Sequence, residues 1–558
     1  MDLTLPARIE LDINSEAGKW NTEQKTQRLW AKDASLWTGG DEGEWLDWLE
    51  IVTKELGRTQ IYRDLRSDID ASGFTDILLM GMGGSSLCPE VLASTFGRTN
   101  FHILDSTVPA QVRSVESKLD IEKTLFIVAS KSGSTLEPNC FKQYFFDLLS
   151  GSVGGENAGR QFIAITDPGS KMERVAKEDG FRHIFYGEPR IGGRFSALSA
   201  FGLTAAAAMG LDVGQFLASA NVMADRCREE SVSKNPGVLL GIVLGVCHRH
   251  GRDKLTIVTS PEVRGLGAWL EQLIAESTGK NGVAIIPVDQ EPPQSAGSYS
   301  DDRLFVFLGV GGEDLTQQLY GDLVEKGHPV IRIGLIGIEA LGQEFFRWEI
   351  ATAVAGSIVG INPFDQPDVE SAKIEARKIT DEYEKTGELP PETSFLMDGQ
   401  LSFFTNNSYE SILKGGHTEP SAKDVINSHL RQLSPADYFA ILAYVEMTDE
   451  TIKILTSIRQ SVLNTSGNAT CLGFGPRFLH STGQAYKGGP NSGVFLQITT
   501  DDPVDVPVPG QEYSFGVVKE AQARGDFQVL LDRERRALRI HISGDLTAGL
   551  LKLVDMVD

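Results

Sequence analysis

Short apolar runs that end in glycine- and serine-rich turns, each followed by a helical pattern, recur along this chain and constrain its fold most. DILLMGMGGSS begins at Asp76, TLFIVASKSGST at Thr124 and QFIAITDPGS at Gln161. This pattern is typical of βαβ units, in which parallel strands are buried between helices. It restarts further on with KLTIVTSPEV, GVAIIPVD, RLFVFLGVGG and HPVIRIGL. The sequence therefore predicts an α/β protein with more than one parallel sheet.

The chain of 558 residues is too long for one hydrophobic core, because domains average roughly 150 residues. Residues 1–60 hold five of the seven tryptophans at spacings that suit amphipathic helices, so we expect an N-terminal helical segment there. We expect two doubly wound domains at residues 61–214 and 215–375. Residues 376–558 return to α/β alternation through ATCLGFG and VFLQITT, which predicts a C-terminal α/β lobe.

The formal net charge of −24 disfavours nucleic acid and anionic lipid as partners. The longest apolar stretch is too short to span a bilayer, and the N-terminus has no pattern of a signal peptide. The five cysteines are far apart and show no metal-ligand spacing, which favours a reducing cytoplasm. An anionic metabolite would need a local pocket of amides, hydroxyls and a few cations.

Two of the predicted turns fit such a pocket. GMGGSS (81–86) follows a strand and precedes a helix, but the dinucleotide fingerprint would need glycine where Ser86 stands. SKSGST (130–135) follows a later strand, and Glu137 is placed to complete a capping box from Ser134. Turns after neighbouring parallel strands share one sheet edge, so four hydroxyls are expected to bind one phosphate: Ser85, Ser130, Ser132 and Thr135. Ordinary helix capping is the alternative interpretation.

Four further residues are candidates for acid–base chemistry. Arg194 is the only cation in GGRFSALSAFG, and two glycines before it permit close approach to a ligand. Glu276 lies near the end of an amphipathic helix, one turn after Gln272, where a carboxylate suited to proton transfer is expected. Lys373 follows NPFDQPDVESA, and His480 lies in FLHSTGQAYKGGP. Each of the four is also compatible with an ordinary surface or structural role.

Taken together, these segments resemble the phosphoglucose isomerase family. The resemblance rests on five motifs that occur in the family's order over roughly residues 75 to 375: GGSSLCPE, SKSGSTLEPN, GGRFSALSAFG, ESTGK and INPFDQPDVESAK. It implies two flavodoxin-like sugar-isomerase (SIS) domains, each a parallel sheet flanked by helices. The whole chain looks most like the isomerase portion of bifunctional transaldolase/phosphoglucose isomerases.

The resemblance implies reversible conversion of glucose 6-phosphate to fructose 6-phosphate through a cis-enediol, without a metal or organic cofactor. Glu276 would be the base, Arg194 would face the developing negative charge, and Lys373 would assist at the ring oxygen. The substrate would be bound by Gly84, Ser85, Ser130, Lys131, Ser132, Thr135 and Gln272. A homodimer is compatible with this resemblance.

Two positions in the sequence are candidates for the catalytic histidine. In the family it normally lies between the glutamate and the lysine, and His328 is the only histidine in that interval. LHSTGQ around His480 instead resembles the HSxGQ context of some bacterial members, so we predict His480 as the ring-opening group. We expect His328 to be structural.

Three other functions compete with this prediction. A non-catalytic sugar-phosphate sensor would keep the serine-rich turns but would have no need of Glu276 or Arg194. An isomerase of another phosphosugar, such as mannose 6-phosphate, would keep all of them. A nicotinamide-dependent dehydrogenase is disfavoured by Ser86, and only Asp105, about 20 residues beyond the first turn, could serve its ribose.

Overall fold

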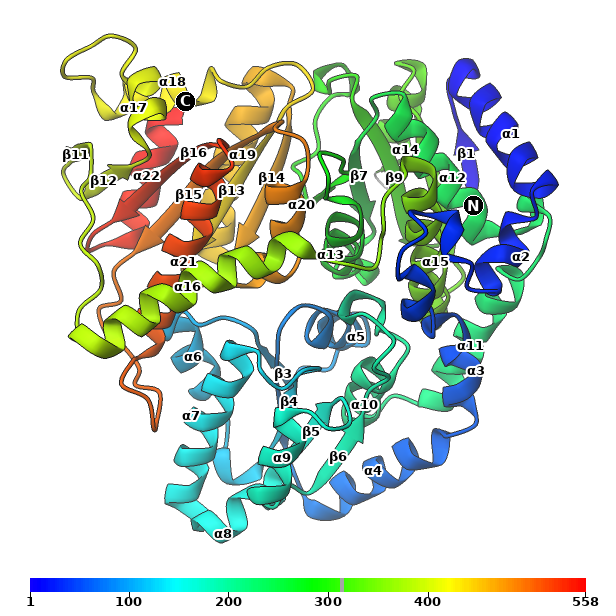
Figure 1. The fold of residues 1–558 in the computed structure, drawn as a ribbon, viewed down its shortest axis with the longest axis horizontal. Helices are drawn as coiled ribbons and strands as arrows, with labels where there is room; N and C mark the ends of the chain where they lie inside the picture. The colour runs from blue at the N-terminus through cyan, green and yellow to red at the C-terminus, as the bar shows by residue number, and fades with distance from the viewer. Residues whose placement is uncertain (312–315, 558) are drawn as a thin grey trace.

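The computed structural model describes residues 1–311 and 316–557. It contains three sheets, each flanked by helices, and Figure 1 shows them as three neighbouring lobes. The first lobe is drawn in blue and cyan at the bottom, the second in green, and the third in yellow to red. Helix α16 (Pro367–Thr386) lies where the third lobe meets the first.

The first sheet has five parallel strands in the order β3-β2-β4-β5-β6. Its strands are β2 (Asp76–Gly81), β3 (Phe101–Leu104), β4 (Thr124–Ala129), β5 (Phe162–Thr166) and β6 (His183–Tyr186). Counted along the chain this order is 2-1-3-4-5, which is that of flavodoxin-like folds. The connections change direction between β2 and β4, so the turns after these strands flank the switch point where such sheets bind ligands. The predicted fold class is confirmed here.

Alternating side chains of the first sheet enter two separate cores. Ile77 and Leu79 face the core shared with α4, α5 and α10, whereas Leu78 and Met80 face α6, α7 and α9. The helices are α4 (Thr59–Ser72), α5 (Leu87–Thr95), α6 (Pro109–Glu116), α7 (Leu136–Val153), α8 (Gly155–Ala158), α9 (Lys171–Glu178) and α10 (Ala200–Ala208). Burial on both faces explains why these strands read as continuous apolar runs.

The second sheet has the order β1-β10-β9-β7-β8. Its parallel strands are β7 (Lys254–Thr259), β8 (Ile286–Asp289), β9 (Arg303–Val310) and β10 (Val330–Leu335), again in flavodoxin-like order. Strand β1 (Asp2–Thr4) pairs antiparallel with β10 at the edge. The N-terminal segment is therefore not helical throughout, because Leu3 packs on the main core while the β1 backbone pairs with an open strand edge.

The helices around the second sheet pack through small residues. Gly237, Gly241 and Gly245 form a stripe on α12 that lies against α15, and a Cβ on Gly241 would lie 2.5 Å from Cβ of Val354. The remaining helices of the first two lobes and the N-terminal segment are α1 (Ala7–Thr22), α2 (Lys25–Trp30), α3 (Trp48–Leu56), α11 (Val213–Arg226), α12 (Pro236–Arg249), α13 (Leu266–Thr278), α14 (Thr316–Glu325) and α15 (Leu341–Val359). One hydrophobic core joins these helices to both sheets.

The third sheet has the order β11-β12-β16-β15-β13-β14. Its strands are β11 (Leu396–Asp398), β12 (Leu401–Phe404), β13 (Tyr438–Tyr444), β14 (Ala469–Phe474), β15 (Gly493–Thr500) and β16 (Arg536–Ile542). The last four are parallel in the order 2-1-3-4, as in the other sheets, and β11 and β12 extend the edge antiparallel. The helices of this lobe after α16 are α17 (Asn407–Lys414), α18 (Ala422–Leu430), α19 (Asp449–Ser466), α20 (Gly483–Gly488), α21 (Phe515–Asp532) and α22 (Leu546–Val557).

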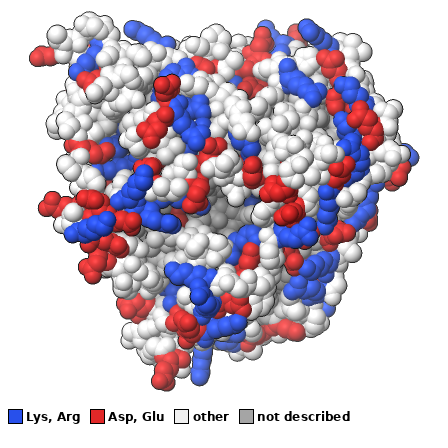
Figure 2. All heavy atoms as spheres, in the orientation of Figure 1, with Lys and Arg blue, Asp and Glu red and all other residues white. Residues whose placement is uncertain are grey.

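The predicted domain boundaries at residues 60, 214 and 375 stay predictions, and each falls inside a helix: α4, α11 or α16. The five cysteines are free and buried. No helix of the described residues is long and apolar enough to cross a membrane. Figure 2 shows basic and acidic side chains interspersed over one face of the molecule.

Candidate active site

The glycine-rich turn after β2 lies against two other parts of the predicted site. Gly83 has φ +55°, and a Cβ there would lie 2.7 Å from Nε2 of Gln272 and 2.9 Å from the carbonyl oxygen of His480. A Cβ on Gly84 would overlap the carbonyl oxygen of Gly193. Only glycine permits such close backbone approach. The first turn, the GGR turn, helix α13 and the loop of His480 therefore meet at one edge of the first sheet.

The predicted phosphate-binding hydroxyls lie on the two turns that flank the first switch point. Ser85 is half-buried in the turn after β2, and Ser130 is buried at the end of β4. Oγ of Ser130 lies 3.4 Å from Oγ1 of Thr135, and Ser132 and Ser134 share a hydrogen bond of 2.8 Å. Thr135 is the N-cap of α7 but forms no capping bond with its side chain. No side chain caps the start of α7, so the amide of Leu136 is placed to donate to an anion, and phosphate binding at this turn stays a prediction.

Lys131 lies on the same turn, but its ammonium group is engaged by the protein. It forms an ion pair with Asp167 and donates to the carbonyl oxygens of Glu188 (3.2 Å) and Pro189 (3.1 Å). Burial raises the pKa of Asp167, although the hydrogen bond from Lys131 opposes the shift. Lys131 therefore fixes the turn to the end of β5, and its role in substrate binding stays a prediction.

Arg194 is almost fully buried, with 1% of its surface exposed, and it joins three segments of the site. Its guanidinium group donates to five oxygens: Ser277 Oγ (2.7 Å), Glu276 Oε1 (3.1 Å), Gln366 Oε1 (2.8 Å), Pro363 O (2.6 Å) and Asp365 O (2.9 Å). Burial lowers the pKa of Arg194, and the charge of Glu276 opposes that shift. Arg194 thus orients the carboxylate of Glu276 directly, which the sequence did not indicate.

Gln272 and Glu276 lie one turn apart on α13, as their spacing predicts. Nε2 of Gln272 donates to Oε2 of Glu276 (3.1 Å) and to the carbonyl oxygen of His480 (2.9 Å). Both side chains are buried, with Glu276 8% exposed. The two carboxylate oxygens of Glu276 therefore face different donors, Gln272 on one side and Arg194 on the other, and this fixes the carboxylate plane.

His480 reaches this site from the third lobe, in the 3₁₀ turn Arg477–His480 after β14. Its Nε2 lies 2.9 Å from Oε1 of Glu137. The same Glu137 oxygen accepts a hydrogen bond from Nε2 of Gln522 (2.7 Å), and Oε1 of Gln522 accepts one from Thr107 (2.7 Å). This chain of contacts fixes one ring nitrogen of His480 and leaves Nδ1 for a ligand.

Glu137 is predicted from the sequence to form half of a capping box with Ser134, and that prediction is wrong. The N-cap of α7 is Thr135, one residue later, so Glu137 does not occupy the capping position and turns inward instead. Burial alone would raise the pKa of Glu137, but the charge and hydrogen bond of His480 outweigh it and lower the pKa. Glu137 therefore stays ionised beside the histidine.

Lys373 lies on α16, two turns from its N-terminus, and is 43% exposed. Its ammonium nitrogen is 3.7 Å from Glu370, and its charge also lowers the pKa of Glu137. Lys373 therefore lies near the Glu137–His480 pair, and its long side chain could change conformation toward that pair.

His328 lies away from these groups, at the start of β10 in the second lobe. It is 4% exposed and packs edge to face against Phe305, with ring centroids 5.3 Å apart. Burial, and then the charge of Arg252, lower its pKa. This environment suits a neutral structural histidine.

Lys280, which sequence reasoning missed, lies just beyond α13. It is 1% exposed, and its ammonium donates to the carboxylate (2.6 Å) and the carbonyl oxygen of Asp365. Burial and the charge of Arg194 lower its pKa from 10.5 to about 8. Its place in ESTGK, between the glutamate and the next strand, was the signal that could have identified it.

The arrangement has the parts that proton transfer on a bound phosphate ester needs. Serine hydroxyls and helix amides lie at one edge of the sheet, a carboxylate is held by an arginine, and a histidine is held by a second carboxylate. Among residues 1–311 and 316–557 there is no group of three metal-ligating side chains placed to hold a metal ion.

Comparison with known proteins shows which family this chain resembles. The sequence model of the phosphoglucose isomerase family matches residues 67–290. A glucose-6-phosphate isomerase from Rubrobacter xylanophilus is 30% identical over 371 residues, which cover 56% of this chain and 83% of that protein. A probable glucose-6-phosphate isomerase from Methanococcus maripaludis is 28% identical over 353 residues, covering 54% of this chain and 78% of that one.

Solved structures also share the fold. A hypothetical protein from Thermus thermophilus superposes with a TM-score of 0.57 at 27% identity and covers 68% of this chain and 99% of its own. A glucose-6-phosphate isomerase from Chlamydia trachomatis has a TM-score of 0.51 at 21% identity, covering 63% of this chain and 76% of its own, and so shows the fold alone. The sequence matches, in contrast, show the family: this chain belongs to the phosphoglucose isomerase family.

Proposed function

We propose that this protein interconverts glucose 6-phosphate and fructose 6-phosphate. The observation that carries the proposal is the convergence of Glu276, held by Arg194, with the hydroxyl-rich turns of the first sheet. A phosphate on those turns would place the carbon chain of the sugar toward α13. A sugar-phosphate sensor would gain nothing from a buried carboxylate oriented by an arginine, so the geometry favours an enzyme.

In the proposed mechanism the phosphate is bound by Ser85, Ser130, Ser132, Thr135 and the amides around Gly84. Nδ1 of His480 and the ammonium of Lys373 assist ring opening, which moves the proton of the C1 hydroxyl to the ring oxygen. The Glu137 carboxylate keeps the histidine in the orientation that this transfer needs. Mannose 6-phosphate would undergo the same ring opening, so the substrate range needs its own measurement.

Glu276 then removes the proton from C2 of the open-chain aldose and leaves a cis-enediolate. The proton of the C2 hydroxyl passes to the C1 oxygen, and the carboxylic acid returns the abstracted proton to C1, which yields the ketose. One carboxylate can serve both carbons because they are adjacent. Arg194 would stabilise the negative charge on the enediolate oxygens, and Gln272 would contact the substrate beside Glu276. We expect no organic cofactor to take part.

Proton exchange at C2 tests the proposal directly. Wild-type protein, incubated in D₂O with glucose 6-phosphate and without nicotinamide or added metal, should form fructose 6-phosphate and incorporate deuterium, as followed by NMR. Glu276→Gln should lower both rates by about 10² to 10⁴-fold, because the amide keeps the shape but accepts no proton. The matched control is Glu325→Gln, at the exposed C-terminal end of α14, which should leave both rates unchanged. Full activity in Glu276→Gln would exclude this residue as the base.

A further inference from the structure

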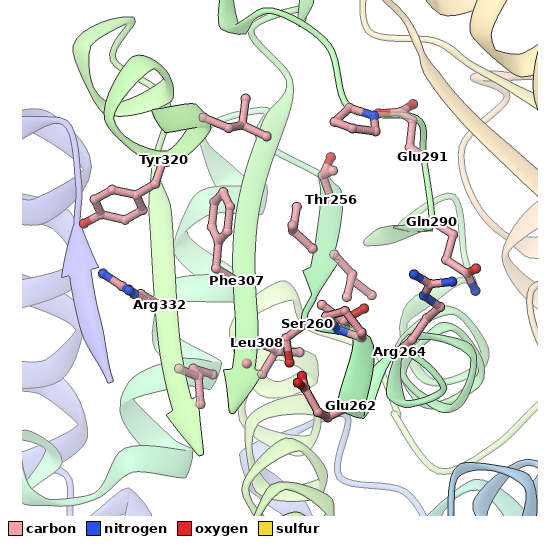
Figure 3. Close-up of a pocket in the computed structure, with 18 of the residues that line it drawn as sticks. Thr256, Ser260, Glu262, Arg264, Gln290, Glu291, Phe307, Leu308, Tyr320 and Arg332 are labelled. Carbon is pink, nitrogen blue, oxygen red and sulfur yellow. The ribbon is translucent and has the colours of Figure 1, made fainter. Parts of the chain in front are cut away.

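The second sheet has a switch point of its own, between β7 and β9, and a cavity lies there that the isomerase site does not use. It has a volume of about 950 Å³ and is lined from the carboxyl end of β7, the loop 290–294 and the outer face of β9 and β10. Figure 3 shows Thr256 and Phe307 on the strands, with Tyr320 and Arg332 at one end and Arg264 and Gln290 at the other. The volume suits a ligand of the size of a nucleotide.

Two glycines explain why the sheet is uncovered at this place. Gly309 and Gly334 are paired across β9 and β10, on the same face of the sheet as Phe307. A Cβ on Gly334 would meet nothing within 4 Å. Helix α14 covers this face further along, where Leu323 packs with Phe305 and Phe307. The glycines of β9 and β10 therefore leave the space that forms the cavity.

The walls of the cavity are mostly apolar and partly aromatic. Phe307 and Tyr320 meet edge to face with ring centroids 5.8 Å apart. Pro261, Pro292 and Pro293 complete the apolar lining. Such walls suit a flat heterocyclic ring, because rings and prolines offer wide contact area without polar groups that need partners.

The charged groups of the cavity are not equivalent. Glu291 is neutralised inside the protein by two hydrogen bonds from Arg303, of 2.8 Å and 3.1 Å. Glu262 is exposed, and a hydrogen bond from Ser260 lowers its pKa, so the carboxylate is ionised at neutral pH. Arg264 is exposed just before α13, and it forms no ion pair with a carboxylate of the described residues. A carboxylate suits ribose hydroxyls, and an arginine suits a phosphate.

We propose that this cavity is a second ligand site, which binds a nucleoside 5′-monophosphate. The base lies against the apolar walls around Phe307, the ribose hydroxyls donate to Glu262, and the phosphate pairs with Arg264. The third sheet gives a contrast: at the carboxyl end of β15 the ammonium of Lys519 lies 2.6 Å from the carbonyl oxygen of Thr500 and 2.6 Å from Asp502, so a cation of the protein itself occupies this strand end. The residues that line the cavity of the second sheet include no lysine in such a position.

Calorimetry on the full chain with adenosine 5′-monophosphate tests this proposal. We expect saturable binding that Arg264→Ala weakens at least about tenfold, the loss expected for one charge-assisted contact. Gly334→Phe should abolish binding by filling the cavity. The matched control, Gly321→Phe on the exposed side of α14, should bind normally. Unchanged isomerase activity in these variants would show that each one is folded.

Three results would overturn the proposal. The first is no binding of the monophosphate to wild-type protein. The second is ribose 5-phosphate binding as tightly, because the apolar walls would then contribute nothing. The third is loss of binding in Ser130→Ala/Thr135→Ala with full binding in Gly334→Phe, which would place the nucleotide in the isomerase site. None of these results bears on sugar-phosphate isomerisation, so failure here and failure of the proposed isomerase function are distinguishable.

Discussion

The first and third sheets share the order 2-1-3-4 of their first four parallel strands and differ at the carboxyl edge. In the first sheet the turns after β2 and β4 carry glycines and serine hydroxyls, and α7 begins after β4 without a side-chain cap. In the third sheet the ammonium of Lys519 lies at the carboxyl end of β15, paired with Asp502. The carboxyl edge therefore carries the turns that we propose to bind the phosphate in the first lobe, whereas in the third lobe an ion pair of the protein itself lies at the end of β15.

The third lobe instead contributes to the site through a different strand. His480 follows β14, one strand away from the switch point, and Gln522 extends from α21 to Glu137. The comparison teaches that strand order decides where a site can form and that turn residues decide whether it forms. Four experiments can break or sharpen this comparison.

The largest effect is expected at the histidine that the third lobe supplies. His480→Ala should slow turnover of the cyclic hexose phosphate by about 10² to 10⁴-fold, because ring opening loses its general acid–base group. Exchange at C2 of substrate already in the open-chain form should be largely spared. The measurement compares the two rates in one NMR experiment.

His328→Ala is the matched control, since it removes a buried histidine from the second lobe. This replacement should at most lower the free energy of unfolding. A selective ring-opening defect in His328→Ala, or equal loss of both steps in His480→Ala, would contradict the assignment of His480.

The next effect concerns Lys519, whose ammonium pairs with Asp502 at the end of β15. Lys519→Met should lower the free energy of unfolding by about 3 to 5 kcal/mol, because Asp502 would lose its buried partner. Urea unfolding measures the change, and Lys519→Met/Asp502→Asn should recover part of it. Substrate affinity at a temperature where the variant is folded should not change. A large loss of affinity would mean that the third sheet also binds the phosphate.

Much of this architecture was predictable from sequence, because parallel strands and their turns are local signals. The apolar runs, the switch-point turns and the i, i+4 pair Gln272 and Glu276 are each encoded within a few residues. The pairing of His480 with Glu137 joins residues 343 positions apart in the chain, and no local periodicity reports such a contact. The cap at Thr135 shows the same limit: a shift of one residue turned Glu137 from the helix end into the site.

A further effect is expected from the hydroxyls of the first sheet. Ser130→Ala/Thr135→Ala should weaken binding of 6-phosphogluconate, since each lost hydrogen bond to a phosphate oxygen costs about 1.5 to 3 kcal/mol. Calorimetry measures the affinity for 6-phosphogluconate. Ser260→Ala, the serine that directly follows β7 in the second sheet, is the matched control and should leave this affinity unchanged. Equal losses in both variants would show that the two sheets do not differ in phosphate binding.

The last effect concerns another buried lysine, Lys280, whose charge acts on Arg194 in the candidate active site. Its pKa is lowered from 10.5 to about 8 in the folded protein, so between these values the unfolded chain holds a proton that the folded chain has released. The free energy of unfolding should therefore rise with pH in this window, by at most about 1.4 kcal/mol per pH unit, and the contribution should be flat below pH 8. Lys280→Met should remove that rise, whereas Lys326→Met, which deletes an exposed ammonium, should follow the wild-type curve. Urea unfolding at pH 7, 8, 9 and 10 measures the difference between the curves. Parallel curves for wild type and Lys280→Met would mean that Lys280 keeps its proton in the folded protein throughout this pH range.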